Sequence, residues 1–178
     1  SRVYYELFNN MDYAGNPEVL FFKHYDRDIG DNFSNQLWNW PNGYGWTREI
    51  LQQFLCDDGL PISVSPRFEG DTLLENLPVN RDPRLVQSVM VPGDPQLIFS
   101  DGDTVVYEKP YLYESTTGYE SKKFRLIEVD PSIGPENQNV DYIFFRFAEA
   151  LLIYAEAKAE LGTLTQGDVD LTINRLRD

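Results

Sequence analysis

A chain of 178 residues is long enough to bury one hydrophobic core, and its 42% hydrophobic and 25% charged residues are those of an ordinary globular protein. The formal net charge of −14 gives a negative field that repels phosphate backbones and anionic lipid headgroups. Nucleic acid and anionic membrane surfaces are therefore excluded as expected partners. The single cysteine, Cys56, excludes an intramolecular disulfide and is expected to be a small buried apolar residue.

The first part of the sequence alternates short apolar segments with polar loops. Apolar residues at positions 3, 4, 7, 8 and 11 have helical spacing, so we expect a helix over residues 3–11. The apolar run at 19–22 predicts a short buried strand or extended segment. Residues 26–46 are rich in Asp, Asn, Gly and Trp and are predicted to form one long loop. Thr47 is then expected to cap a helix over residues 48–56.

The middle of the chain, about residues 60–141, is predicted to be an irregular, partly extended insert. Prolines recur throughout it and forbid long helices. Short extended pieces are expected at 86–91, 104–107 and 123–128. The segment Asn80-Arg-Asp-Pro-Arg84 is expected to be a loop held by side-chain hydrogen bonds.

The last segment predicts an antiparallel helical hairpin at about residues 144–178. Apolar residues recur at helical spacing from about Phe144 to Leu161, and Gly162 is suited to end that helix. Thr165 and Asp168 resemble a capping box that begins a second helix. Six residues are expected to face inward: Leu151, Leu152, Ala155, Val169, Ile173 and Leu176. A side-chain pair between Arg146 and Glu149, one helical turn apart, is also expected. One hairpin of tetratricopeptide size cannot bury its own apolar face, so we expect either further helices against it or exposed apolar area.

The sequence resembles the SusD/RagB family in several blocks that occur in the family's order and span nearly the whole chain. These blocks are Thr47 with Asp58-Gly59 and Pro61-Ile62, Asn80-Arg-Asp-Pro-Arg-Leu85, Thr117-Gly-Tyr119 with Lys122-Lys123, Phe145-Arg-Phe-Ala-Glu-Ala-Leu-Leu-Ile-Tyr-Ala-Glu-Ala157 with Glu160-Leu-Gly162, and Ile173-Asn-Arg-Leu-Arg177. Each block is modest alone, and the ordered combination is specific.

The resemblance implies a mostly α fold of tetratricopeptide-like helical hairpins, with a long irregular insert, in which residues 1–178 are an internal fragment of a single SusD-like domain. It also implies a lipoprotein on the exterior face of the outer membrane of a Bacteroidota-type bacterium, with the lipid anchor outside this fragment. Such proteins serve polysaccharide utilisation: they hold oligosaccharide for a SusC-like TonB-dependent transporter, without chemistry and without a cofactor.

Four aromatic residues near the end of the long loop are the candidate carbohydrate-binding site. They are Trp38, Trp40, Tyr44 and Trp46. Apolar faces of sugars stack on flat aromatic rings, while Asn39 and Asn42 offer hydrogen bonds to hydroxyls. Gly43 and Gly45 would allow close approach of the backbone to a ligand. The alternative is that these rings fill the core beneath the loop, and we expect at least one Trp to do so.

Signals for catalysis and for metal binding are weak, and no catalytic or metal-ligating residue is assigned. His24 is the only histidine and is expected to be structural. Asp26, Asp28 and Asp31 are spaced like a calcium loop, but Gly30 stands where a ligand is expected. A glycosidase would need two carboxylates at hydrolytic spacing, and with 29 acidic residues such a pair has no specificity. The rival function is a helical-repeat scaffold that binds a protein or peptide.

Overall fold

The computed structural model describes residues 3–29, 45–110, 115–129 and 140–177, and these form two compact units. Unit 1 is made of Ser1–Met11 and Tyr25–Val140, and unit 2 of Asp12–His24 and Asp141–Asp178. Each unit therefore combines segments that lie far apart in the sequence.

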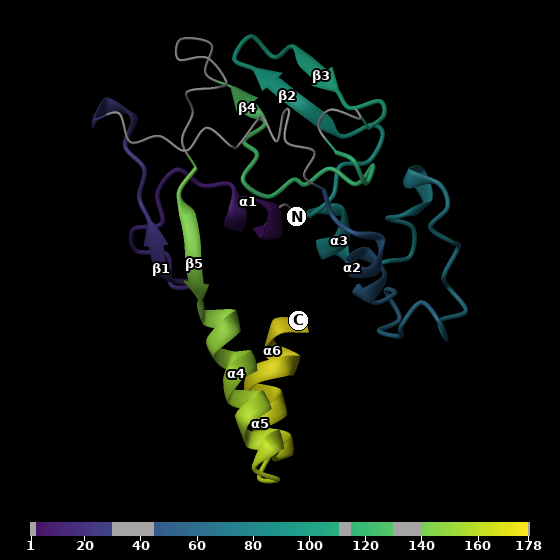
Figure 1. Cartoon of the computed structure of the whole chain (residues 1–178), viewed down its shortest axis with the longest axis vertical. Helices are drawn as coiled ribbons and strands as arrows, with labels where there is room; N and C mark the ends of the chain where they lie inside the picture. Colours follow the sequence, from purple (N-terminus) through teal and green to yellow (C-terminus); the bar gives the residue numbers. More distant parts are fainter. Residues whose placement is uncertain (1–2, 30–44, 111–114, 130–139, 178) are drawn as a thin grey trace. The chain divides into compact units, whose positions relative to one another are not determined.

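Unit 2 begins with a two-stranded antiparallel ribbon. Strand β1 (Val19–Lys23) pairs with β5 (Tyr142–Arg146), and the two lie side by side in Figure 1. Their aromatic and β-branched residues suit a pleated surface. The strand expected at 19–22 is confirmed, but it is not buried as expected, because Leu20 and Phe21 are 51% and 61% exposed. The helix expected from about Phe144 starts at Phe147, because pairing with β1 holds residues 142–146 extended.

Two helical segments follow the ribbon, as the two apolar stripes predict. Helix α4 (Phe147–Glu160) has Leu161 as its C-cap and is followed by Gly162, whose φ of +65° is a left-handed conformation that glycine adopts without strain. Helix α5 (Gln166–Val169) begins with the complete capping box of Thr165 and Asp168. The chain continues through a π-helical turn (Asp170–Asn174) into α6 (Arg175–Arg177) and runs back along α4 (Figure 1).

The inward face of this hairpin differs in part from the prediction. Ala155 is buried, and Leu151 and Ile173 are half-buried, as expected. Leu152 is 51% exposed, so its predicted inward position is wrong. One residue further along a helix lies about 100° around the axis, so Leu152 stands at the edge of the face that Leu151 and Ala155 form.

Arg146 pairs with a different residue from the one that the sequence suggested. Its Nη1 lies 3.1 Å from Glu18 Oε1, whereas Glu149 was the expected partner. The expected pair requires both residues on one helix. Arg146 instead ends β5 with an extended backbone, and Glu18 immediately precedes the partner strand β1.

The main hydrophobic core of unit 1 lies between short helices and loops. Helix α1 spans Val3–Phe8, α2 spans Arg48–Gln53 and α3 spans Pro83–Val86; single 3₁₀ turns cover Arg27–Ile29 and Leu74–Asn76. The buried residues of this core are Leu51, Leu77, Leu85, Val89 and Val91. Thr47 caps α2 as predicted, its side chain accepting a hydrogen bond from the Ile50 amide at 3.4 Å.

Both predicted helices of unit 1 are shorter than expected. The first ends at Phe8 and not at residue 11, and the second ends at Gln53 and not at Cys56. Cys56 is buried, as expected, and forms an isolated β-bridge with Arg81. That bridge takes the backbone of Cys56 out of the helical conformation.

A three-stranded sheet completes unit 1, with the strands in the order β3-β2-β4 (Figure 1). Strand β2 (Pro95–Phe99) pairs antiparallel with β3 (Thr104–Val106) and parallel with β4 (Glu128–Val129). The extended piece at 104–107 is largely confirmed. The extended conformation predicted for residues 86–91 is wrong at its start, because Val86 ends helix α3. Asp82 caps this helix and Pro83 occupies its first turn.

Buried polar contacts join α1 to the segment before β4. The Tyr5 hydroxyl donates to the Arg125 carbonyl oxygen at 2.5 Å. The Arg125 side chain pairs with Glu120 at 3.3 Å, and the Tyr107 hydroxyl donates to Glu120 at 3.1 Å. Because all four side chains are buried, these contacts hold the irregular segment in one arrangement. Over the described ranges, no helix has the length and apolar character needed to cross a membrane.

Candidate functional site

Trp46 is the one of the four candidate ring residues that the structure describes. Trp38, Trp40 and Tyr44 lie outside the described residues. The Trp46 indole N–H donates to the Ser88 carbonyl oxygen at 2.8 Å, and its backbone N–H donates to the Tyr119 carbonyl oxygen at 2.8 Å. The ring is half-buried and packs against the core cluster of unit 1. Trp46 therefore contributes to the core, as expected of at least one Trp.

Gly45 is needed where the loop meets the segment after residue 114. A Cβ at this position would lie 2.2 Å from Ser115 Oγ and 2.4 Å from Thr117 Oγ1. Among described atoms, the missing side chain thus allows close approach of the loop to Ser115 and Thr117. Gly43, which was also expected to allow close approach of a ligand, lies outside the described residues.

The Lys123 ammonium group lies over three aromatic rings of unit 1. It is 3.9 Å from the ring centroid of Phe8, 5.4 Å from Trp46 and 5.6 Å from Tyr4. Attraction between a cation and an aromatic face stabilises such an arrangement by about 0.5–1 kcal/mol or more for each well-placed ring. Lys123 therefore holds Trp46 and the aromatic face of α1 around one positive charge.

A pocket of about 300 Å³ lies in the same unit and shares Tyr4 with this aromatic group. Its lining residues are Tyr4, Ile50, Gln53, Phe54, Leu55, Asp82 and Arg84. Two rings and two aliphatic side chains supply apolar walls. One amide, one carboxylate and one guanidinium supply hydrogen-bonding groups. Sugars present both apolar faces and hydroxyl edges, so this mixture suits a saccharide unit.

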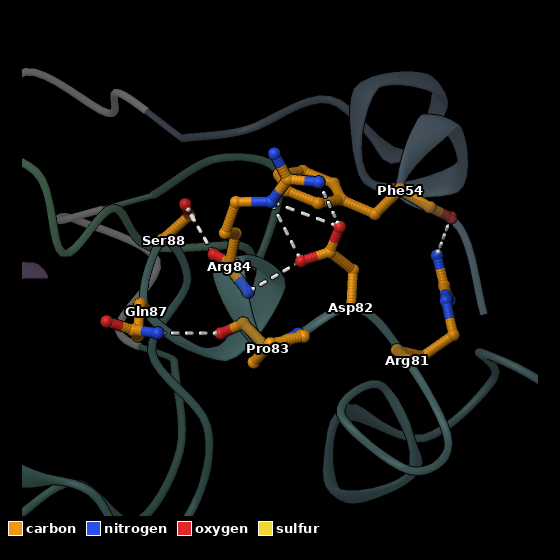
Figure 2. Close-up of polar contacts among 7 residues, drawn as sticks. All are labelled: Phe54, Arg81, Asp82, Pro83, Arg84, Gln87 and Ser88. Carbon is orange, nitrogen blue, oxygen red and sulfur yellow. Dashed lines mark hydrogen bonds and ion pairs between the residues drawn. The ribbon is translucent and has the colours of Figure 1, made fainter. Parts of the chain in front are cut away.

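Asp82 and Arg84 contribute charged groups to the lining of the pocket, and Figure 2 shows how these two side chains contact each other. The Asp82 carboxylate accepts hydrogen bonds from both Nε and Nη2 of Arg84 and from the Arg84 amide. This carboxylate raises the pKa of Arg84, and burial opposes it. The pair fixes the direction of both side chains.

Arg81 has a structural role behind the pocket. It is only 5% exposed, and its Nη2 donates to the carbonyl oxygens of Leu51 and Phe54 at 2.8 and 2.9 Å. Burial lowers its pKa. Figure 2 shows the Phe54 contact at the C-terminal end of α2, where helix carbonyls need donors. The predicted side-chain hydrogen bonds are confirmed, but Pro83 and Arg84 belong to α3 and not to a loop. Asn80 (φ 54°) adopts the left-handed conformation that Asn tolerates.

The sequence predicted side-chain hydrogen bonds in the Asn80–Arg84 segment, but it did not predict the pocket. Four pocket residues come from α2 and the two positions after it, and Tyr4 comes from α1, far away in the chain. The available signal was the block Asn80–Leu85 itself, whose two arginines flank an Asp-Pro pair. A short segment that contains two arginines and an aspartate is expected to form ion pairs within itself. One of these pairs, Asp82 with Arg84, lines the pocket.

The other residues considered for a metal also have defined places. The Asp26 carboxylate accepts a hydrogen bond from the Asp28 amide at 2.8 Å, which is a local turn contact; Asp31 lies outside the described residues. His24 Nδ1 lies 2.9 Å from Asp141 Oδ2 and 3.1 Å from Oδ1. The structural role expected for His24 is consistent with this contact.

Comparisons with known proteins identify the class of protein. The sequence profile described as "SusD family" matches residues 9–178. The chain therefore belongs to the SusD family. No curated protein matches the chain.

Two solved structures share the fold. One is described as a SusD-like carbohydrate binding protein from Bacteroides fragilis; it has a TM-score of 0.71 and 23% identity, and the match covers 99% of this chain and 36% of that one. The other, a SusD-like protein from the same organism, has a TM-score of 0.66 and 20% identity, and the match covers 94% and 37%. The chain thus spans little more than a third of the length of these relatives.

Proposed function

We propose that this chain is part of a protein that binds oligosaccharide at the outer face of the outer membrane and passes it to a SusC-like TonB-dependent transporter. The proposal assigns no reaction to the protein. The observation that carries it is the family match over residues 9–178. A structure of the same fold from Bacteroides fragilis is described as carbohydrate binding, which adds support.

The proposed binding surface combines the aromatic loop with the pocket beside α2. Trp38, Trp40, Tyr44 and Trp46 would provide stacking faces, and Asp82 and Arg84 would provide oriented hydrogen-bonding groups. Cooperation of the two sets rests on Tyr4, which lines the pocket and shares Lys123 with Trp46. A protein that captures a ligand before transport must also release it. We therefore expect dissociation constants of roughly micromolar to millimolar, which correspond to binding free energies of about 4–8 kcal/mol.

The architecture is proposed to be tetratricopeptide-like. In this proposal, α4 with α5–α6 is one hairpin of a helical superstructure, residues 1–178 belong to one SusD-like domain, and residues 60–141 form its irregular insert. A lipid anchor would lie outside this chain. The capping box at Thr165 and the return of the chain along α4 support the hairpin part of the proposal.

Calorimetry and thermal melting of four single alanine variants test the proposed ring residues. Replacing Trp38, Trp40 or Tyr44 is expected to lower glycan affinity with little change in the melting temperature. Trp46→Ala is expected to lower stability as well, because its indole bonds Ser88 and packs on the core. If all four variants lose stability and none loses binding, the aromatic loop is not the site.

A second candidate function is a scaffold that binds a protein or peptide. The apolar side chains exposed on the hairpin favour it, since Leu152 is 51% and Leu171 55% exposed. Peptide binding that persists after the aromatic loop and pocket are altered, but is lost on polar substitution of Leu152, would support this candidate over the glycan proposal.

A further inference from the structure

We infer that Asp12, His24 and Asp141 form a binding site for a divalent transition-metal ion, and that zinc is the ion this ligand set fits best. One potential ligand atom from each residue lies within 4.8 Å of the other two. Imidazole nitrogen and carboxylate oxygen are ligands that zinc commonly takes, whereas calcium and magnesium take oxygen. The inference concerns unit 2 and is independent of the proposed glycan binding.

The β1–β5 pairing places two of the ligands directly opposite each other. Phe22 faces Ile143 and Lys23 faces Tyr142, so the next step of this antiparallel register brings His24 to Asp141. His24 Nδ1 lies 2.9 and 3.1 Å from the two Asp141 oxygens. Two ligand atoms about 2.1 Å from one ion lie roughly 3.0–3.4 Å apart in octahedral or tetrahedral geometry. An ion can thus replace the proton between them with little movement.

The third ligand is held near the strands by its neighbour in the sequence. Tyr13 is 1% exposed and packs edge-on against Phe22 of β1, with ring centroids 5.7 Å apart. The Asp12 Oδ1 atom accepts a hydrogen bond from the Ala14 amide at 2.7 Å, which orients the carboxylate. Because Asp12 is exposed and the His24 side chain is 56% exposed, an ion can enter from solvent.

The burial of Asp141 favours a cation at this place. Its side chain is 0% exposed. A buried carboxylate is costly unless positive charge and hydrogen bonds compensate for its lost hydration. A divalent ion bound between Asp141 and His24 places two positive charges beside the buried carboxylate.

The three ligands also mark the positions where the chain changes units. Asp12 and Asp141 are first residues of unit 2 segments, and His24 is the last residue of one. His24 and Asp141 are 117 positions apart in the sequence. Residues so distant are brought together only in the folded chain, so a metal ion that binds them together stabilises the folded state. The expected role of the ion is therefore to stabilise unit 2.

Zinc titration with thermal melting tests the site. The protein carrying this chain is purified without a histidine tag and stripped with a chelator. Zinc at about a hundredfold excess over its dissociation constant is expected to raise the melting temperature by roughly 5–10 °C. Asp12→Asn is expected to weaken zinc binding by at least about tenfold. Asp12 is exposed, so this variant is expected to fold.

Two further measurements decide the outcome. Asp28→Asn changes an exposed acid of unit 1 and should leave the zinc response unchanged. X-ray absorption of the zinc-loaded protein should show imidazole scattering that His24→Gln removes. The inference is overturned if zinc has no effect, if calcium gives the same shift, or if Asp12→Asn and Asp28→Asn behave alike. A zinc shell that contains only oxygen would also overturn it.

Discussion

The irregular part of unit 1 and the regular hairpin of unit 2 differ in how well they bury their apolar residues. In unit 1, Leu51, Leu77 and Leu85 are at most 2% exposed, although two of them lie in very short helices and one in a loop. In the hairpin, Leu152 and Leu171 are more than half exposed. The backbone hydrogen bonds of a helix form within the helix itself. Burial of its apolar side chains requires a second element that packs against it.

This difference shows where the stability of the described residues resides. Side chains such as Arg81 satisfy helix-end carbonyls and allow a proline-rich segment to pack as a core. The hairpin has well-formed ends, with Gly162 after α4 and the capping box before α5, but little of its surface is covered. A single hairpin was expected to leave apolar side chains exposed, and Leu152 and Leu171 are exposed among the described residues.

The largest expected effect comes from the buried ion pair of unit 1. Arg125→Met leaves Glu120 buried without the guanidinium 3.3 Å away, and removal of one partner of such a pair costs about 3–5 kcal/mol. Arg146→Met removes the partly exposed pair with Glu18 in unit 2 and is expected to cost about 1 kcal/mol or less. Denaturant unfolding of both variants measures the two losses. Equal losses of unfolding free energy in the two variants would contradict the proposed difference between unit 1 and unit 2.

A leucine in each region gives the next comparison. Leu85→Ala empties a fully buried site and is expected to cost about 2–5 kcal/mol. Leu152→Ala is expected to change stability by less than about 0.5 kcal/mol, since its side chain is 51% exposed. Circular dichroism during urea unfolding follows both. A large loss for Leu152→Ala would mean that other polypeptide covers this face in the protein tested.

The smallest expected effect is the pH dependence of the hairpin. Hydrogen bonds from the Thr165 side chain and amide, and from Tyr154, hold the pKa of Asp168 well below its usual range. A group whose pKa is lowered by folding stabilises the folded state above its unfolded pKa of about 3.9 and loses that effect as pH falls toward the folded pKa. Helicity should therefore decrease below about pH 4. Asp168→Asn should weaken that dependence, and an unchanged dependence would exclude the cap as its cause.

Local signals in the sequence predicted the parts of the fold that depend on neighbouring residues. The caps at Thr47 and Thr165, the stop at Gly162 and the strand at 19–22 depend on residues a few positions away, and the structure has all four. The pairing of β1 with β5 could not be predicted, since it joins segments more than a hundred residues apart. That pairing converted the expected first turn of α4 into a strand and gave Arg146 a partner in Glu18.

The candidate site was predictable only in part, for the same reason. Aromatic residues clustered in one loop are visible in a sequence, and Trp46 proved to pack on the core. The pocket could not be seen, because Tyr4, Phe54 and Arg84 come from three separate helices or their ends. The juxtaposition of His24 with Asp141 likewise follows from strand register alone.

A calorimetric screen of the protein carrying this chain tests the proposed oligosaccharide binding. Neutral oligosaccharides of different linkage and a matched set of peptides are titrated separately. We expect at least one oligosaccharide to bind with a dissociation constant of roughly micromolar to millimolar, and no peptide to bind comparably. Binding of peptides with no response to any oligosaccharide would contradict it.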